Sequence, residues 1–210
     1  MTDSICMQKW GIHAIERELK SPGTGKTQTR LIVIPQPDAG QFFGSVTLLP
    51  DQRKAIFRNA CGIRQDIKAP YAPGDLIWVR EEWLHIDDEN DKFDGLGSQT
   101  YYRADQTPRD EDLIRKDGLK WSPAADMPRW ASRLTLKVTR VRCERLQDIN
   151  GDALREEGLD IPPGPPLSPR ETKYWKPTFA DLWNSLHGPG AWDKNPWVWA
   201  IRFQPIARDD

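Results

Sequence analysis

The segment from Arg133 to Arg145 constrains the fold more than any other part of the chain. Apolar and polar residues alternate from Leu134 to Val138, and this period of two is typical of a half-buried β-strand. The apolar series then continues one residue out of phase from Val141. A slip of this kind predicts a β-bulge near Thr139-Arg140, which bends the strand as small barrels require.

Further elements are predicted on both sides of this strand. The spacing of apolar residues predicts helices over 12–19, 52–59, 148–157 and 179–186. Runs rich in strand formers predict strands over 31–34, 76–83, 101–103 and 197–203. We expect one α+β domain over residues 1–210, a small, mixed, partly closed β-barrel with a few peripheral helices and with insertions at about 38–70 and 87–120.

Composition excludes several classes of function. The 30 basic and 31 acidic residues give a net charge of -1, so no overall positive field holds a long duplex. The three cysteines are widely spaced without a Cys-x-x-Cys pair, and the three histidines do not cluster with them. We therefore expect no disulfide framework, metal site or cofactor. The apolar runs fall far short of the roughly 20 residues that cross a bilayer, so we expect a cytoplasmic protein with no membrane contact and no obligate protein partner.

The segment Pro22 to Thr27 matches the end of a nucleoside triphosphatase phosphate loop, Gly-x-x-x-x-Gly-Lys-Ser/Thr. The context disagrees. Lys20 stands where the first glycine belongs, a predicted helix precedes the segment, and a predicted strand follows it. A phosphate loop requires the opposite order, a strand before and a helix after. We reject this interpretation.

The hexapeptide Gly25 to Arg30 instead resembles the Gly-x-Lys signature of the ASCH family, barrel domains related to the PUA modules that bind RNA. Further blocks resemble the form of this domain common in phage and prophage genomes, and they occur in the same order along the chain: Pro73 to Trp83, Met127 to Arg133, Leu146 to Ile149, Glu157-Gly158 and Asn195 to Trp199. The resemblance implies a PUA-like mixed β-barrel over nearly the whole chain.

Some bacterial ASCH proteins are amidohydrolases that remove the acetyl group of N4-acetylcytidine with a Lys, a Thr and a Glu. By similarity these positions are Lys26, Thr29 and Glu157. A threonine hydroxyl needs a base to become a nucleophile, and a lysine serves as that base when burial or a nearby cation lowers its pKa. A family arginine falls at Leu31, whereas this chain has Arg30 one residue earlier.

Other residues are candidates for contact with the substrate, which we expect to be a modified nucleoside or a short single-stranded nucleic acid. They are the charged or aromatic residues Arg30, Glu81, Trp83, Trp130 and Arg133. Tryptophans stack on bases but also fill cores, and Trp78, inside an apolar strand, is expected in the core. Arg133 begins a basic run that is either a solvated strand face or a phosphate-contacting edge.

Three functions stay open on the sequence alone. The first is hydrolysis of an N4-acylated or otherwise modified pyrimidine nucleoside, with Thr29 as nucleophile, Lys26 as its activator and Glu157 as proton relay. The second is non-catalytic recognition of RNA or of modified bases through the same pocket. The third is metal-dependent RNA cleavage, which has been attributed to some relatives.

Overall fold

The computed structural model describes residues 3–37, 43–49, 53–59, 63–86 and 98–207. The α-helices are α1 (Lys9–Lys20), α2 (Pro108–Lys116), α3 (Gly151–Glu156) and α4 (Pro169–His187). The strands are β1 (Asp3–Cys6), β2 (Gln28–Ile32), β3 (Phe43–Leu49), β4 (Lys54–Asn59), β5 (Arg64–Lys68), β6 (Leu76–Arg80), β7 (Trp83–Ile86), β8 (Gln99–Tyr102), β9 (Leu134–Arg145) and β10 (Trp197–Ala207). Short 3₁₀ turns cover Arg103–Asp105, Ala124–Asp126, Arg129–Ala131 and Leu146–Asp148.

Strands β9 and β10 form the centre of a five-stranded sheet with the order β1-β6-β9-β10-β2. β10 is antiparallel to both β9 and β2, and β1 is parallel to β6. The β9–β10 register shifts where Arg202 faces Arg140 and Phe203 faces Val138, which leaves Thr139 as the extra residue. The bulge predicted from the slipped apolar series is therefore confirmed.

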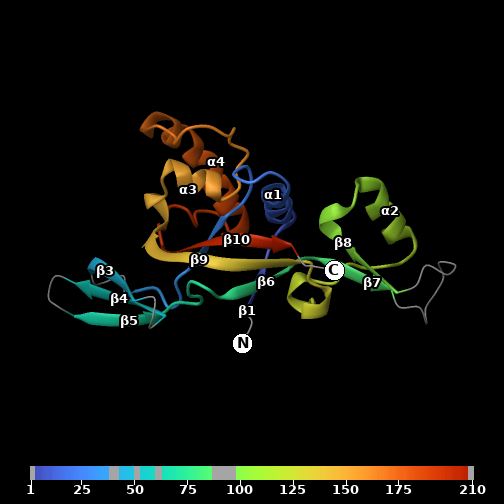
Figure 1. Cartoon of the computed structure of the whole chain (residues 1–210), viewed down its shortest axis with the longest axis horizontal. Helices are drawn as coiled ribbons and strands as arrows, with labels where there is room; N and C mark the ends of the chain where they lie inside the picture. Colours follow the sequence, from blue (N-terminus) through green and yellow to red (C-terminus); the bar gives the residue numbers. More distant parts are fainter. Residues whose placement is uncertain (1–2, 38–42, 50–52, 60–62, 87–97, 208–210) are drawn as a thin grey trace.

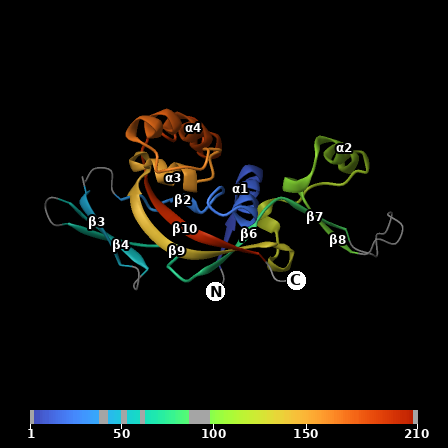
Figure 2. The same ribbon diagram turned by 45° about the horizontal axis from the view of Figure 1, so that its top comes forward.

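Two small sheets extend the molecule at opposite ends of β9 and β10 (Figures 1 and 2). The three-stranded sheet β3-β4-β5 lies at one end, and the hairpin β7-β8 lies with α2 at the other. Strands β3, β4 and β5 lie within the first region that we expected to be an insertion, and β8 and α2 lie within the second.

Two apolar cores lie on opposite faces of β10, because neighbouring residues of a strand point in opposite directions. Trp199 and Ile201 belong to the larger core, which also contains Ile12 of α1. Val198 belongs to the second core, which is formed mainly by α3, α4 and the segments next to them and includes Trp183. Strand β10 thus packs against α1 on one face and against the α3–α4 pair on the other.

Several predicted boundaries differ from the structure. The helix predicted over 52–59 is wrong, because Lys54–Asn59 is the middle strand β4, paired on both sides; Gln52 lies outside the described residues. The strand predicted over 76–83 breaks after Arg80, where Glu81 turns inward to pair with Arg133. The helix predicted from residue 179 begins ten residues earlier, at Pro169.

The capping box that starts this helix has Ser168 as N-cap and Glu171 three residues into the helix. It is a start signal that lies upstream of the apolar stripe from which we predicted the helix. Strand β2 likewise begins at Gln28, ahead of the apolar run at 31–34.

The α+β class predicted from the sequence is confirmed. Strands β1 and β2 are the two edges of the central sheet and do not pair with each other within the described residues. No helix in the described part of the chain is long and apolar enough to span a bilayer.

Candidate active site

The segment Gly25 to Thr27 is a junction where three elements meet. The Lys26 N–H donates to Ala14 O of α1, the Thr27 N–H donates to Glu156 O of α3, and the Phe203 N–H of β10 donates to Thr27 O. Such bonds hold the segment in one place relative to both cores. They explain why the polar residues that follow it enter β2 in a fixed register.

Two glycines permit this close packing. A Cβ on Gly25 would lie 2.2 Å from Ala14 O and 2.3 Å from Glu18 N, both backbone atoms that cannot move aside. Gly158, which ends α3 with φ +91°, would place a Cβ 2.9 Å from Lys26 Cβ. The glycines therefore bring the start of β2 against α1 and the end of α3.

The backbone donors of the apparent phosphate loop are already occupied. The N–H groups of Gly23 and Gly25 both donate to the carboxylate of Glu18, at 2.9 Å. A protein carboxylate thus takes the place that a phosphate would need, and β2 instead of a helix follows the turn. This geometry supports the rejection of a nucleotide phosphate site.

A buried cluster of opposite charges lies directly after the junction. Lys26 Nζ donates to Glu157 Oε2 at 2.9 Å and to the Glu157 carbonyl oxygen at 2.8 Å. Arg30 Nη1 donates to the other carboxylate oxygen of Glu157 at 2.6 Å, and Arg30 Nη2 donates to Glu144 at 2.6 Å. Lys26, Arg30 and Glu157 are all less than 5% exposed. Residues 131 positions apart in the sequence therefore form one charged unit.

The environment of Lys26 lowers its pKa. Removal from water lowers the pKa of the Lys26 ammonium below its ordinary value of 10.5, Glu157 opposes this effect, and the Arg30 guanidinium adds to it. The direction is the one that a lysine general base requires.

A cavity of about 230 Å³, which we call the Lys26 cavity, adjoins this cluster. Lys26, Thr29, Arg30 and Glu157 all line it. The four residues at the centre of the sequence-based site are thus brought together. The volume suits a ligand about as large as a single nucleobase or nucleoside.

Thr29 reaches this cavity from a different side than its neighbours. Gln28 and Arg30 are buried and Thr29 is half-buried between them, as expected for alternate faces of β2. Because Thr29 and Arg30 both line the cavity, it extends around the free edge of β2. The Thr29 hydroxyl makes no hydrogen bond within the described residues.

A set of ring side chains, which we call the aromatic wall, also lines the cavity. Trp10 of α1 and Phe179, Trp183 and His187 of α4 line it. The Lys26 ammonium lies 4.9 Å from the centre of the Trp10 ring, and the Trp183 and His187 rings are 4.1 Å apart. Burial lowers the pKa of His187, which favours its neutral form. The sequence did not assign these four residues to the site; for Phe179, Trp183 and His187 the available signal was their spacing of four along α4.

The wall offers hydrogen-bond donors without acceptors. The indole N–H groups of Trp10 and Trp183 are buried and have no partner within the described residues. An indole N–H can only donate, and a buried unpaired donor costs about 1–3 kcal/mol. A ligand oxygen or unprotonated nitrogen that reached these N–H groups would satisfy both.

The other four predicted substrate contacts lie elsewhere. Arg133 makes two bonds to buried Glu81, and its guanidinium lies 4.2 Å from the Tyr102 ring. Trp83 and Trp130 pack edge to face at 5.7 Å near the β7–β8 hairpin. None of Glu81, Trp83, Trp130 and Arg133 lines the Lys26 cavity. Burial raises the pKa of Glu81, an effect that Arg133 opposes.

No group of three or more His, Cys, Asp or Glu side chains in the described residues is arranged to hold a metal ion. Cys61 lies outside these residues.

Comparisons with protein-family models, with curated proteins and with solved structures found no match to this chain.

Proposed function

We propose that this chain is an ASCH-type amidohydrolase with a PUA-like, partly closed barrel, and that it removes the acyl group from an N4-acylated cytosine nucleoside. The observation that carries the proposal is Lys26, a fully buried lysine with a lowered pKa, bonded to Glu157 at the wall of a nucleobase-sized cavity. Perturbed titratable groups in a cavity are typical of active sites.

The donors of the cavity suit this substrate. Neutral N4-acylcytosine presents the acyl oxygen, N3 and O2 as acceptors. The unpaired indole N–H groups of Trp10 and Trp183 supply matching donors. The aromatic wall also provides rings on which a base stacks.

The proposed reaction has two steps. Thr29 Oγ1 attacks the acyl carbon while the neutral Lys26 amine takes the hydroxyl proton. The bond between the acyl carbon and N4 then breaks, and N4 receives a proton from Lys26 or through Glu157, which leaves the cytosine amine and an acyl ester on Thr29. Water hydrolyses the ester, releases the carboxylic acid and restores Thr29.

The test is incubation with N4-acetylcytidine while the absorbance change of deacetylation is followed. Thr29→Val removes the nucleophile and Lys26→Met removes its base, so each should lower kcat by at least about 100-fold, the lower end of what a positioned base contributes. Thr27→Val is the matched control, since Thr27 is also half-buried and lies two residues away. Its kcat should stay within threefold. Absence of turnover, or equal effects of the two Thr variants, would contradict the proposal.

One observation favours the rival function, non-catalytic recognition of a modified base. Lys26 donates twice to Glu157, and both carboxylate oxygens of Glu157 are engaged, as in a structural ion cluster. Binding of N4-acetylcytidine without turnover, measured by calorimetry and weakened in Trp183→Phe, would support this function instead.

A further inference from the structure

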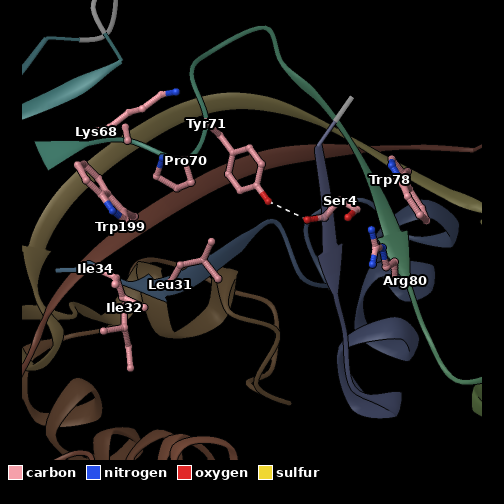
Figure 3. A pocket seen from close by; sticks show the side chains of 11 residues that line it. Ser4, Leu31, Ile32, Ile34, Lys68, Pro70, Tyr71, Trp78, Arg80 and Trp199 are labelled. Atoms are coloured by element: carbon pink, nitrogen blue, oxygen red, sulfur yellow. Dashed lines mark hydrogen bonds between the residues drawn. The ribbon is translucent and has the colours of Figure 1, made fainter. Parts of the chain in front are cut away.

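A second and larger hollow, about 690 Å³, lies between the two edge strands of the central sheet (Figure 3). We call it the seam groove. Ser4 of β1 lies on one side and Ile32 of β2 on the other. Tyr71 spans part of the gap and donates its hydroxyl hydrogen to Ser4 O at 3.0 Å. The groove thus follows the line along which the sheet is open.

The seam groove adjoins the Lys26 cavity. Leu31 lines both hollows. On β1, Ser4 lines the groove and the next residue, Ile5, lines the cavity. On β2, Ile32 lines the groove and both Leu31 and Ile32 follow Arg30, which lines the cavity. The two hollows therefore meet at Leu31 between the same pair of edge strands, so the groove lies beside a ligand bound in the cavity.

The charges of the groove are all positive. Lys68 and Arg80 are its only charged lining residues, and no acidic side chain lines it. Lys68 makes no ion pair within the described residues. Arg80 donates from Nη1 to Ala125 O and likewise makes no ion pair within the described residues. The groove therefore offers two cationic groups to an anion.

An aromatic ring supports the second cation. The Arg80 guanidinium lies 4.7 Å from the centre of the Trp78 ring. Trp78 was expected in the core, but it is half-buried on the face opposite Ile77 and Val79. Figure 3 shows Trp78 and Arg80 together near β1 and Lys68 at the far side of Tyr71. Cations beside exposed ring faces, spread along a groove, are typical of sites for single-stranded nucleic acids.

We propose that the seam groove holds the sugar–phosphate chain next to the base in the Lys26 cavity. This inference rests on the proposed function and specifies its substrate: a single-stranded oligonucleotide that contains the modified base, not a free nucleoside. Lys68 and Arg80 contact phosphates, and Trp78 stacks on a neighbouring base. A peptide strand paired with the open edges fits less well, because its neutral backbone would leave both cations without a partner.

The experiment measures the affinity of a fluorescein-labelled, unmodified RNA hexamer by anisotropy at several salt concentrations, with the DNA hexamer in parallel. Lys68→Ala/Arg80→Ala should weaken binding of whichever polymer binds by at least tenfold. The slope of log affinity against log salt should fall by about 1.4, at about 0.7 for each lost phosphate contact. Lys68 is exposed, so Lys68→Ala alone should keep the fold and lower the slope by about 0.7.

The matched control is Arg109→Ala/Lys116→Ala, which removes the same charges from exposed positions on α2. It should leave affinity within twofold. Equal effects of the two double variants, or no binding of either hexamer to the unaltered protein, would overturn the inference.

The result is independent of turnover. If N4-acetylcytidine is not hydrolysed but the seam variants still weaken hexamer binding selectively, the proposed reaction fails and the groove assignment stands. If the nucleoside is hydrolysed at the same rate by the seam variants and the hexamer does not bind, the reaction stands and the groove assignment fails.

Discussion

The buried charge cluster makes a specific prediction for Glu157→Gln. The change keeps the shape of the side chain but removes the carboxylate that both Lys26 and Arg30 use. Arg30 retains its bond to Glu144, whereas Lys26 loses its only carboxylate partner within the described residues. The variant therefore isolates one buried ammonium group that is 1% exposed.

The expected stability loss of Glu157→Gln follows from two limits. Loss of one partner of a buried ion pair costs about 3–5 kcal/mol. Lys26 can instead lose its proton, and the free energy of deprotonation is then the largest stability loss possible. Deprotonation at pH 7 of a lysine with an ordinary pKa of 10.5 costs about 5 kcal/mol, at about 1.4 kcal/mol for each pH unit. We expect a loss of about 4 kcal/mol at pH 7.

The sign of the pH dependence is fixed by linkage. When the folded-state pKa of a lysine lies below its unfolded value, the unfolded state binds more protons between the two values, so stability rises with pH. The largest stability loss possible for Glu157→Gln therefore falls to about 2 kcal/mol at pH 9. The difference from the unaltered protein should therefore shrink as pH rises toward 10.5.

The assay is urea unfolding at pH 7, 8 and 9, with the free energy extrapolated to water. The control is Lys26→Met/Glu157→Gln, which has no buried ammonium and should be more stable at pH 7 than Glu157→Gln, with little change in stability between pH 7 and 9. A loss below about 1 kcal/mol for Glu157→Gln, independent of pH, would refute the reasoning that Lys26 is charged and dependent on Glu157.

Three further predictions concern the site. Because the neutral Lys26 amine is the proposed base and its pKa is lowered, kcat/KM for N4-acetylcytidine should rise with pH along a limb whose midpoint lies below 10.5; a pH–rate profile in which Lys26→Met keeps this limb would contradict it. Gly25→Ala should destabilise the fold by about 3 kcal/mol in urea unfolding, since its Cβ overlaps α1 backbone atoms, whereas Gly164→Ala, where a Cβ meets open space, should cost less than about 1 kcal/mol. Trp183→Phe should weaken nucleoside binding about tenfold in calorimetry, the loss of one hydrogen bond, and an unchanged affinity would exclude the Trp183 N–H as a ligand donor.

Local patterns predicted the central strands well and the peripheral ones poorly. The slip in the apolar series located the bulge at Thr139, because that signal is contained within one strand. The helix expected over 52–59 is wrong because β4 is fixed by pairing with β3 and β5, a non-local effect. The break after Arg80 depends on the buried Glu81–Arg133 pair, whose members are 52 residues apart.

The site shows the same division. The family resemblance named Lys26, Thr29 and Glu157, and Arg30 was a separate candidate one residue before the position of the family arginine; the structure places all four around one cavity. The aromatic wall was not foreseen, because Phe179 and Trp183 have the same spacing whether they fill a core or face a ligand. Only the packing of α4 beside β2 shows that these two side chains also line a cavity.

The three-way junction at Gly25 to Thr27 restricts the number of residues in this segment as well as their identity. The segment is bonded to α1, α3 and β10, so its ends cannot slide. One residue added or deleted between Thr27 and Arg30 would reverse the alternation of β2 and turn the Arg30 side chain away from Glu157 and Glu144. An insertion here should therefore be tolerated less readily than a substitution at Thr27, and homologous chains should keep the number of residues between Lys26 and Arg30.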